Sequence, residues 1–234
     1  MLRNRMPRGA IPSPRYRIAA AMPHTMIGAT PPNHIRIPHK LSFWGNDIYG
    51  DCVTAEEAFA KACHDREIFI PNQEAIDWAT NHGVLNGAYL INVLDMMLTD
   101  GFPKHHHKYD DGNPFAVDWT NAALLDNAIH HGPVKLGIAA DQLDGAYWST
   151  GGKSGWFAVG FHPDSNEDHC VSLCGYGSID WLAHHLHVAV PSGVDGTKPG
   201  YAMFTWNSIG IIDVPSMVAI TQEAWLRRPT TERK

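Results

Sequence analysis

The sequence predicts an α+β protein, with a mainly helical first half followed by a second half made mainly of strands. Apolar residues recur at helical spacing through the first 130 residues, as in the stretch 88–99, and this spacing is typical of amphipathic helices. Beyond residue 132, short apolar runs alternate with glycine and proline turns, which indicates strands. Because separate runs of helices and strands favour α+β architecture, we expect two lobes that meet at a cleft.

Local signals predict the individual elements in chain order. Asp47 and Gly50 mark a turn before the first long helix, and Gly101 and Gly132 end the two later ones. The expected helices are Cys52 to about Arg66, Ala88–Thr99 and Thr120–His130. The expected strands are Val134–Ala140, His169–Tyr176, His185–Val190 and Tyr201–Trp206.

The chain divides into three expected segments: an extended arm over residues 1–40, a helical lobe over 41–115 and a β-rich lobe over 116–234. The arm is rich in proline and arginine, and its apolar patch at residues 18–22 ends at Pro23. That patch is short for the core of a signal peptide, so we favour no secretion signal. The 234 residues, 44% of them hydrophobic, are enough for two lobes that share a real core.

Charge and cysteine content exclude several classes of protein. The formal net charge is −6 and no basic run stands out beyond the arm, so we expect no nucleic-acid partner. No stretch of eighteen apolar residues exists, so we expect no membrane span. The four cysteines form no CxxC pair, which favours reduced thiols in a cytoplasm-like compartment over a secreted disulfide scaffold.

Fifteen histidines raise the question of a bound metal. Two clusters stand out, one at residues 105–107 and one at residues 184, 185 and 187. Neither cluster has a cysteine or carboxylate partner at zinc-ligand spacing, so we interpret both as solvated loop residues. We therefore expect neither a metal nor a cofactor.

One cysteine has the surroundings of a nucleophile. Cys52 opens a predicted helix, and the positive end of a helix dipole lowers the pKa of a thiol. His169 lies on a predicted strand that can hold an imidazole rigidly, and Asn207 follows a later strand. A thiol, a base and an orienting polar group are the parts that nucleophilic catalysis needs. From spacing alone, however, a buried apolar role is the more frequent one for a single cysteine.

Five sequence segments together resemble the papain-like cysteine peptidases and occur in the order of that family. The segments are NDIYGDC at residues 46–52, NGA at 86–88, GPV at 132–134, DHCVSLCGYG at 168–177 and WNSIG at 206–210. They span about residues 41 to 215. One such match can arise by chance, but five in order identify the chain as a divergent papain-like member, of an intracellular or a phage or bacterial type.

The resemblance implies a two-lobe papain-like fold, with a helical lobe, an antiparallel barrel-like β lobe and the active site in the cleft between them. It implies a Cys-His-Asn triad of Cys52, His169 and Asn207. It also implies hydrolysis of peptide or isopeptide bonds through a thioester. The amide of Asn46 and the Cys52 backbone N–H would stabilise the oxyanion. The remaining implied residues bind the peptide substrate: Asn86, Gly87, Ala88 and Asp168.

Several residues depart from the family pattern. Asp51 places a carboxylate beside the thiol and should oppose its ionisation. Ile209 replaces the tryptophan that covers the histidine in the family, a place that Trp206 or Trp181 could fill. The 37 residues between His169 and Asn207 indicate an insertion around residues 181–200. The arm is too short for a long helical pro-segment, but it could still cover the cleft or pack elsewhere.

Two alternatives to hydrolysis stay open. In the first, an amine attacks the thioester in place of water, which makes the protein an acyl or peptidyl transferase that ligates or cyclises peptides. In the second, the protein is a catalytically silent papain-like scaffold used for binding or assembly, within a larger particle. The complete set of Cys52, His169 and Asn207 argues against a silent scaffold, whereas Asp51 and Ile209 keep it open.

Overall fold

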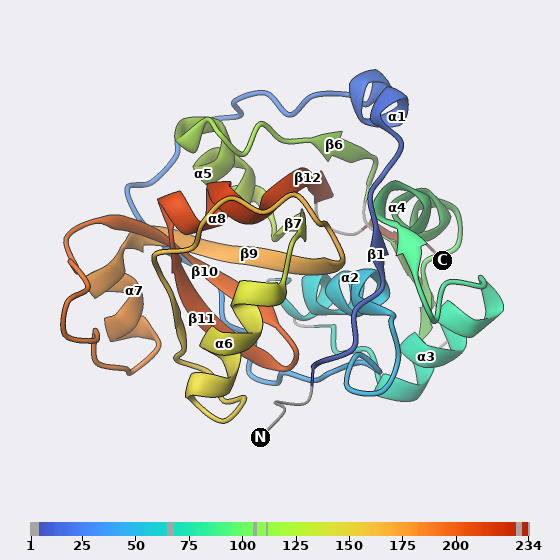
Figure 1. Ribbon diagram of the computed structural model, residues 1–234. Helices are drawn as coiled ribbons and strands as arrows, with labels where there is room; N and C mark the ends of the chain where they lie inside the picture. The colour runs from blue at the N-terminus through green and yellow to red at the C-terminus, as the bar shows by residue number, and fades with distance from the viewer. Residues whose placement is uncertain (1–4, 65–67, 105–106, 111, 228–230, 234) are drawn as a thin grey trace.

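The computed structural model describes residues 5–64, 68–104, 107–110, 112–227 and 231–233. It is an α+β structure, as predicted, and helices pack around one large sheet (Figure 1). The helices are α1 (Arg15–Ala20), α2 (Cys52–Ala62), α3 (Asn72–Asn81), α4 (Leu90–Thr99), α5 (Ala122–His131), α6 (Asp141–Ser149), α7 (Ile179–His185) and α8 (Val214–Ile220). Within the described residues, none of these helices has the length and apolar character needed to cross a bilayer.

The sheet has the order β6-β12-β7-β9-β10-β11-β8, and β2 pairs with β9 outside this path. Its strands are β2 (His34–Ile35), β6 (Pro114–Ala116), β7 (Val134–Ile138), β8 (Phe157–Ala158), β9 (His169–Ser178), β10 (Pro199–Thr205), β11 (Ser208–Asp213) and β12 (Thr221–Arg227). All neighbours in it run antiparallel except β11 and β8. β9 is therefore held on both sides, by β7 and by β10, and it begins at the candidate base His169.

Five shorter strands lie outside the large sheet. β4 (Phe102–Lys104), β5 (His107–Asp110) and β13 (Thr231–Arg233) form a three-stranded sheet, and β1 (Ala10–Ile11) pairs with β3 (Ala88–Tyr89). Of the two histidine clusters, residues 105 and 106 lie outside the described residues, whereas His184 and His185 lie on α7.

α2 lies in the centre of the molecule, against β9 (Figure 1). All of its eleven residues are buried, including the charged side chains of Glu56, Glu57 and Lys61. Its buried charges are compensated across the core. The carboxylate of Glu57 lies 3.0 Å from Lys135 Nζ on β7 and 3.5 Å from Arg227 Nη1 on β12. This cluster ties the helix that carries Cys52 to the sheet.

The predicted strand at residues 185–190 is wrong. The structure has helix α7 at Ile179–His185, followed by a turn and a loop. The hydroxyl of Ser178 accepts a hydrogen bond from the backbone N–H of Trp181, which caps the helix. Ile179, Leu182 and Ala183 then bury one helical face. The short apolar alternation after His185 is thus a loop from this helix toward β10, and its Leu186, Val188 and Val190 are half-buried against the core.

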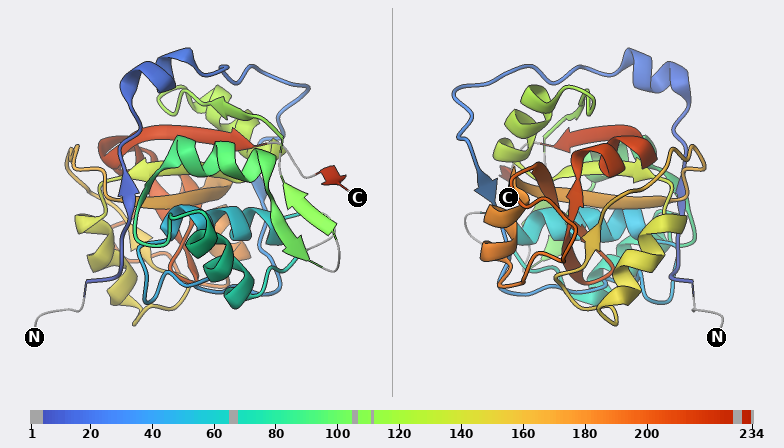
Figure 2. Two further views of the ribbon diagram at one scale, coloured as in Figure 1. Left: turned by 90° about the vertical axis from the view of Figure 1, so that its right-hand side faces the viewer. Right: turned by 60° about the vertical axis from the view of Figure 1, so that its left-hand side comes forward.

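The N-terminal arm runs along the surface and links both halves of the molecule. β1 crosses in front of α2, α1 lies at the top, and the chain then passes over the top to β2 (Figures 1 and 2). The helix α1, six residues long, lies within the described part of the arm. The pairing of β1 with β3 is parallel and brings Ala10 opposite Ala88.

Candidate active site

Cys52 is the first residue of α2, and its side chain is completely buried. The backbone N–H groups of Cys170, on β9, and of Gly9, in the arm, lie against its sulfur. Burial raises the pKa of the thiol to about 12, and the two N–H groups offset only part of that effect. In this state of the protein the thiol is neutral at physiological pH.

His169 is the first residue of β9 and is also completely buried. Its Nε2 atom shares a hydrogen bond of 2.8 Å with the hydroxyl of Thr205. Its ring stacks on Trp206, with the ring centroids 4.4 Å apart. Within the described part of the chain, Nδ1 has no hydrogen-bond partner. Burial, and then the charge of Arg8, hold the pKa of His169 well below its ordinary value, so the imidazole is neutral and Nδ1 is the nitrogen left for proton transfer.

Asn207, the predicted partner of the His169 imidazole, lies in a hairpin turn. Trp206 and Asn207 form the two-residue turn between β10 and β11, and both have left-handed backbones, with φ of 42° and 62°. Two left-handed residues are typical of tight hairpins, and asparagine adopts this conformation easily. The hydrogen bond to the imidazole comes from Thr205, the last residue of β10, and not from Asn207. Thr205 is therefore a site residue that the sequence analysis missed.

The tryptophan that covers the histidine comes from the position predicted as a substitute. Trp206 stacks on His169, whereas Trp181 stacks on His185 in α7. The indole N–H of Trp206 donates to the carbonyl of Pro7, in the arm, over 3.2 Å. The departure at Ile209 is thus compensated within the same hairpin.

Asn46, the predicted oxyanion donor, is almost completely buried beside the same arm segment. Its side-chain amide donates to the backbone carbonyl of Tyr49 at 3.0 Å and to that of Pro7 at 3.4 Å. The carbonyl of Pro7 therefore receives donors from both Asn46 and Trp206, where a substrate carbonyl is expected.

The predicted peptide-binding segment at residues 86–88 is also occupied by the arm. The backbone N–H of Ala88 donates to the carbonyl of Gly9 at 2.9 Å, and Gly87 has φ of 129°, a region that favours glycine. Beside this pair lies a cavity of about 400 Å³, bounded by the arm, Asn86, Gly87 and Asp168. Strand addition is the expected mode of peptide binding here, and the arm already uses it.

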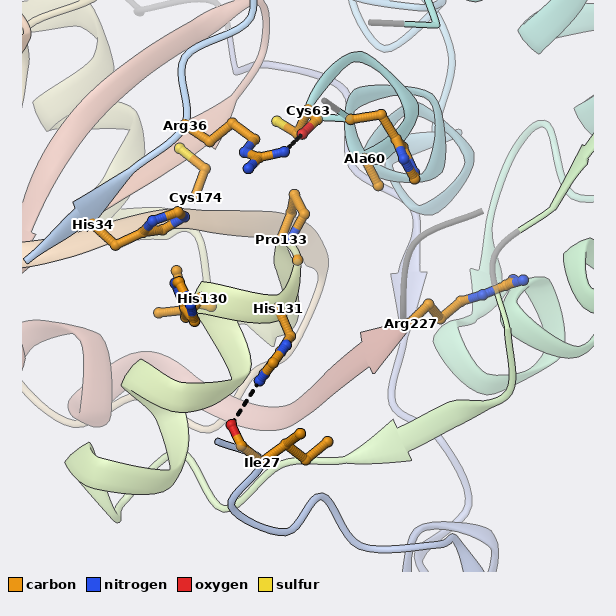
Figure 3. A pocket seen from close by; sticks show the side chains of 13 residues that line it. Ile27, His34, Arg36, Ala60, Cys63, His130, His131, Pro133, Cys174 and Arg227 are labelled. Carbon is orange, nitrogen blue, oxygen red and sulfur yellow. Dashed lines mark hydrogen bonds between the residues drawn. The ribbon is translucent and has the colours of Figure 1, made fainter. Parts of the chain in front are cut away.

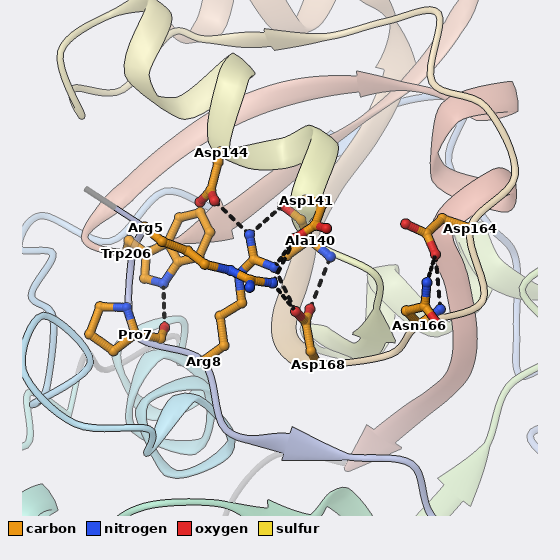
Figure 4. A network of polar contacts seen from close by, with 10 residues as sticks. All are labelled: Arg5, Pro7, Arg8, Ala140, Asp141, Asp144, Asp164, Asn166, Asp168 and Trp206. Atoms are coloured by element: carbon orange, nitrogen blue, oxygen red, sulfur yellow. Dashed lines mark hydrogen bonds and ion pairs between the residues drawn. The ribbon is translucent and has the colours of Figure 1, made fainter. Parts of the chain in front are cut away.

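Asp168, directly before His169, anchors the arm through ion pairs (Figure 4). Its Oδ2 atom accepts from Arg8 at 2.5 Å and from Arg5 at 2.9 Å, and its Oδ1 accepts from the backbone N–H of Ala140. The backbone carbonyl of Asp168 also accepts from Ala10 at 3.1 Å. The arm is thus held at the mouth of the site by backbone and side-chain contacts together.

The carboxyl of Asp51 opposes ionisation of the thiol less than its sequence position indicates. Burial raises the pKa of Asp51 from 3.8 to about 8, so this carboxyl is mostly protonated at neutral pH. Burial is also the first cause of the raised pKa of Cys52, and the charge of Asp51 is a smaller one. The main obstacle to a thiolate is therefore the covered state of the site.

A further cavity, of about 410 Å³, is lined by the C-terminal end of α2 and by β9 at Cys174 (Figure 3). Its lining includes His34 and His130, whose rings lie 5.1 Å apart edge to face, together with Arg36 and the thiols Cys63 and Cys174. Burial lowers the pKa of His34 to about 4. Neither Cys52 nor His169 lines this cavity, so it is separate from the candidate active site.

Comparison with known proteins places the fold. No protein-family model matches the sequence, and no curated protein matches it. Among solved structures, the chain is similar to xylellain, a cysteine protease from Xylella fastidiosa, with a TM-score of 0.63, 13% identity and coverage of 98% of this chain and 99% of that one. It is also similar to the bromelain protease from Ananas comosus in complex with the E64 inhibitor, with a TM-score of 0.57, 13% identity and coverage of 85% and 99%.

A third similar structure is the proform of Amb a 11, a cysteine protease and ragweed pollen allergen. The TM-score is 0.61, the identity is 11%, and the match covers 87% of this chain but only 66% of the proform. The chain therefore has the papain-like fold, as the sequence resemblance predicts, with a sequence far diverged from these neighbours.

Proposed function

We propose that the protein is a cysteine peptidase whose nucleophile is Cys52 and whose general acid and base is His169, closed in the described state by its own N-terminal arm. The observation that carries the proposal is the combination of a thiol at the start of α2 with an imidazole at the start of β9 whose Nδ1 is unpartnered in the described part of the chain. Both lie under one extended segment of chain in a papain-like fold. A silent scaffold has no physical need for this arrangement.

The reaction follows once a substrate replaces the arm. His169 Nδ1 takes the proton of the Cys52 thiol, and the thiolate attacks the carbonyl carbon of the peptide bond. The oxyanion is stabilised by the Cys52 backbone N–H and the Asn46 amide, which in the described state donates to Pro7. His169 then gives its proton to the departing amine, so the C–N bond breaks and a thioester remains. Water, activated by the same imidazole, hydrolyses the thioester and restores the thiol.

Thr205 and Trp206 act as positioning residues in this scheme. In this scheme the Nε2–H of His169 donates to the Thr205 hydroxyl, so the lone pair that takes the thiol proton is on Nδ1. The stacked indole of Trp206 restricts rotation of the ring and keeps water from that face. This pair takes the place that the family pattern gives to an asparagine.

The experiment needs a chain in which the arm no longer covers the thiol. The Gly9→Ala variant serves, because a Cβ at Gly9 would lie 1.7 Å from the carbonyl oxygen of Gly50. This chain is incubated with a peptide library, with and without added amines, and the products are identified by mass spectrometry. We expect hydrolysis that is abolished by Cys52→Ala and retained in Cys63→Ala, the matched change of another buried thiol. Products joined to the added amine would instead assign the transferase activity.

A catalytically silent scaffold is the second candidate, and one observation favours it. The thiol of Cys52, with a pKa of about 12, and the neutral imidazole of His169 do not form an ion pair in the described state. If the arm never leaves, this state is permanent and the fold serves binding alone. An unreactive Cys52 in the Gly9→Ala chain would establish this second candidate.

A further inference from the structure

The guanidinium of Arg8 occupies a pocket built to hold this chemical group (Figure 4). Its Nη1 atom donates to Asp141 Oδ1 at 2.6 Å and to Asp168 Oδ2 at 2.5 Å. Its Nη2 atom donates to Asp144 Oδ2 at 2.6 Å and to the backbone carbonyl of Ala140 at 3.0 Å. Four acceptors thus surround two nitrogens of one planar group, and the Arg8 side chain keeps only 6% of its exposure.

The pocket is rigid because its walls belong to regular elements near the site. Asp141 and Asp144 lie in the first turn of α6, which follows β7 closely, and β7 pairs with β9 so that Ile138 lies opposite His169. Asp168 is fixed by the hydrogen bond from the Ala140 backbone N–H to its Oδ1. The backbone positions of the three carboxylates are therefore set by regular elements, and the carboxylate of Asp168 is also held independently of Arg8.

The residue in the pocket, Arg8, is a direct neighbour in the chain of the two arm residues that contact Asn46 and Cys52. Arg8 stands between Pro7, whose carbonyl accepts from Asn46, and Gly9, whose N–H lies against the sulfur of Cys52. The pocket is also on the side of His169, because its occupant Arg8 lies near enough for its charge to lower the pKa of that residue. Since His169 gives its proton to the departing amine, this side of the cleft receives the leaving part of a substrate.

We propose that Asp141, Asp144 and Asp168 form a specificity pocket for an arginine of the peptide substrate, on the leaving-amine side of the bond that is cleaved. The inference rests on the proposed peptidase function and adds a substrate class to it: peptides with an arginine directly after the scissile bond. Arg8 is the resident occupant of this pocket, so the arm and such substrates compete for it.

The geometry selects arginine over other side chains. A planar guanidinium presents two nitrogens in a fixed fork, which here reaches three carboxylates and one carbonyl, whereas a lysine ammonium is a compact point charge that cannot span them. Citrulline has the shape of arginine without its charge. When Arg8 leaves, Arg5 still pairs with Asp141 and Asp168, whereas Asp144 loses its ion-pair partner among the described residues. A cationic ligand restores that pair, and citrulline does not.

The test measures binding in the full-length chain, with turnover blocked by Cys52→Ser and the pocket vacated by Arg8→Gln. The probe is the peptide Met-Pro-Arg-Gly-Ala-Ile, which repeats residues 6–11, and calorimetry compares it with versions that carry lysine, citrulline or glutamine in place of arginine. We expect the arginine peptide to bind at least about tenfold more tightly than the glutamine peptide, which corresponds to about 1.4 kcal/mol. Adding Asp144→Asn should remove this preference. Asp77→Asn makes an equal charge change at an exposed position of α3 and should leave the preference for arginine unchanged.

Equal binding of the four peptides would overturn the inference, and so would a preference that survives Asp144→Asn. If circular dichroism finds the Arg8→Gln chain unfolded, Arg8→Lys carries the same test, because it keeps a cation that arginine peptides can displace. The outcome also separates the two proposals. Arginine-selective binding without any reactivity of Cys52 would contradict the proposed peptidase function and support the arginine pocket. Cys52-dependent hydrolysis without arginine preference would support the peptidase function and contradict the pocket.

Discussion

The imidazole of His169 is held by the hydroxyl of Thr205, 2.8 Å from Nε2. We predict that Thr205→Ala, made in the Gly9→Ala chain, lowers kcat for peptide hydrolysis by roughly tenfold or more, because a general acid and base that contributes 10²–10⁴-fold loses its orientation. Thr205→Ser keeps the hydroxyl and should restore most of the rate. Steady-state kinetics on one peptide substrate measures both.

Asn207 supplies the matched comparison for Thr205. Its backbone has φ of 62°, a conformation that glycine adopts without strain, so Asn207→Gly removes the side chain alone. We expect Asn207→Gly to lower kcat for peptide hydrolysis less than Thr205→Ala does. A larger loss at Asn207, with Thr205→Ala near the parent rate, would return the orienting role to the asparagine.

The contact between Gly9 and Gly50 makes the arm sensitive to one methyl group. A Cβ at Gly9 would meet the Gly50 carbonyl oxygen at 1.7 Å, and backbone atoms cannot move aside as a flexible side chain does. We predict that Gly9→Ala raises the rate at which iodoacetamide modifies Cys52 by at least about tenfold, since the thiol becomes exposed and its pKa falls. Peptide mapping by mass spectrometry after timed quenching gives the rate.

Gly145→Ala is the control for this prediction, because a Cβ at Gly145, on α6, meets nothing within 4 Å. Its labelling rate should equal that of the unchanged chain. If Gly9→Ala also labels at the unchanged rate, while remaining folded, the arm does not protect Cys52.

The buried carboxyl of Asp51 should make stability depend on pH in a defined direction. Its pKa in the folded protein, about 8, lies above the value of 3.8 in the unfolded chain. The folded state therefore holds a proton that the unfolded state has lost between these values, and stability falls as pH rises from about 4 to about 8. One proton accounts for a slope of at most about 1.4 kcal/mol per pH unit.

Asp51→Asn removes this proton and should flatten the dependence. Urea denaturation at pH 5, 6, 7 and 8 gives the free energy of unfolding of both chains, and the variant should gain stability over the parent as pH rises. Asp77→Asn, at an exposed position of α3, controls for the charge change. Parallel curves for Asp51→Asn and the parent chain would mean that Asp51 is ionised in the folded protein.

The ion pair between Glu57 and Lys135 joins α2 to β7 in the core, with 3.0 Å between Glu57 Oε1 and Lys135 Nζ. Removing one partner leaves a buried charge without its counter-ion, which costs about 3–5 kcal/mol. We predict that Lys135→Met lowers the free energy of unfolding by that amount in urea. Lys153→Met, on the surface, should change it little. A loss under about 1 kcal/mol at Lys135 would mean that other buried cations near Glu57 replace it.

Much of the fold could be predicted because its signals are local. The helix that begins at Cys52 and the strands from Val134 and from His169 follow from periodicity and turn residues, and the structure has each of them within a few residues. The strand predicted at residues 185–190 is wrong, because helix α7 runs to His185 and the chain continues in a turn and a loop.

The candidate site could be predicted only in part, because some of its residues meet through tertiary pairing. Asn207 lies in the two-residue turn of a hairpin, and the register of β10 on β9 brings Thr205 to the imidazole. The sequence predicts a charged carboxylate at Asp51, but burial keeps this carboxyl mostly protonated at neutral pH. The position of the arm depends on ion pairs between Arg8 and carboxylates more than 130 residues away in the chain. No local sequence pattern predicts such long-range pairs.

The most direct test of the central claim is the reaction of the Gly9→Ala chain with E64, an inhibitor found in complex with a structural neighbour. Intact-mass and peptide-level mass spectrometry locate the adduct among the four cysteines. The proposed function predicts one adduct, on Cys52, which disappears in His169→Ala and in Cys52→Ser. Modification of Cys63, Cys170 or Cys174 ahead of Cys52, or no adduct on the folded chain, would contradict the assignment of Cys52 as the nucleophile.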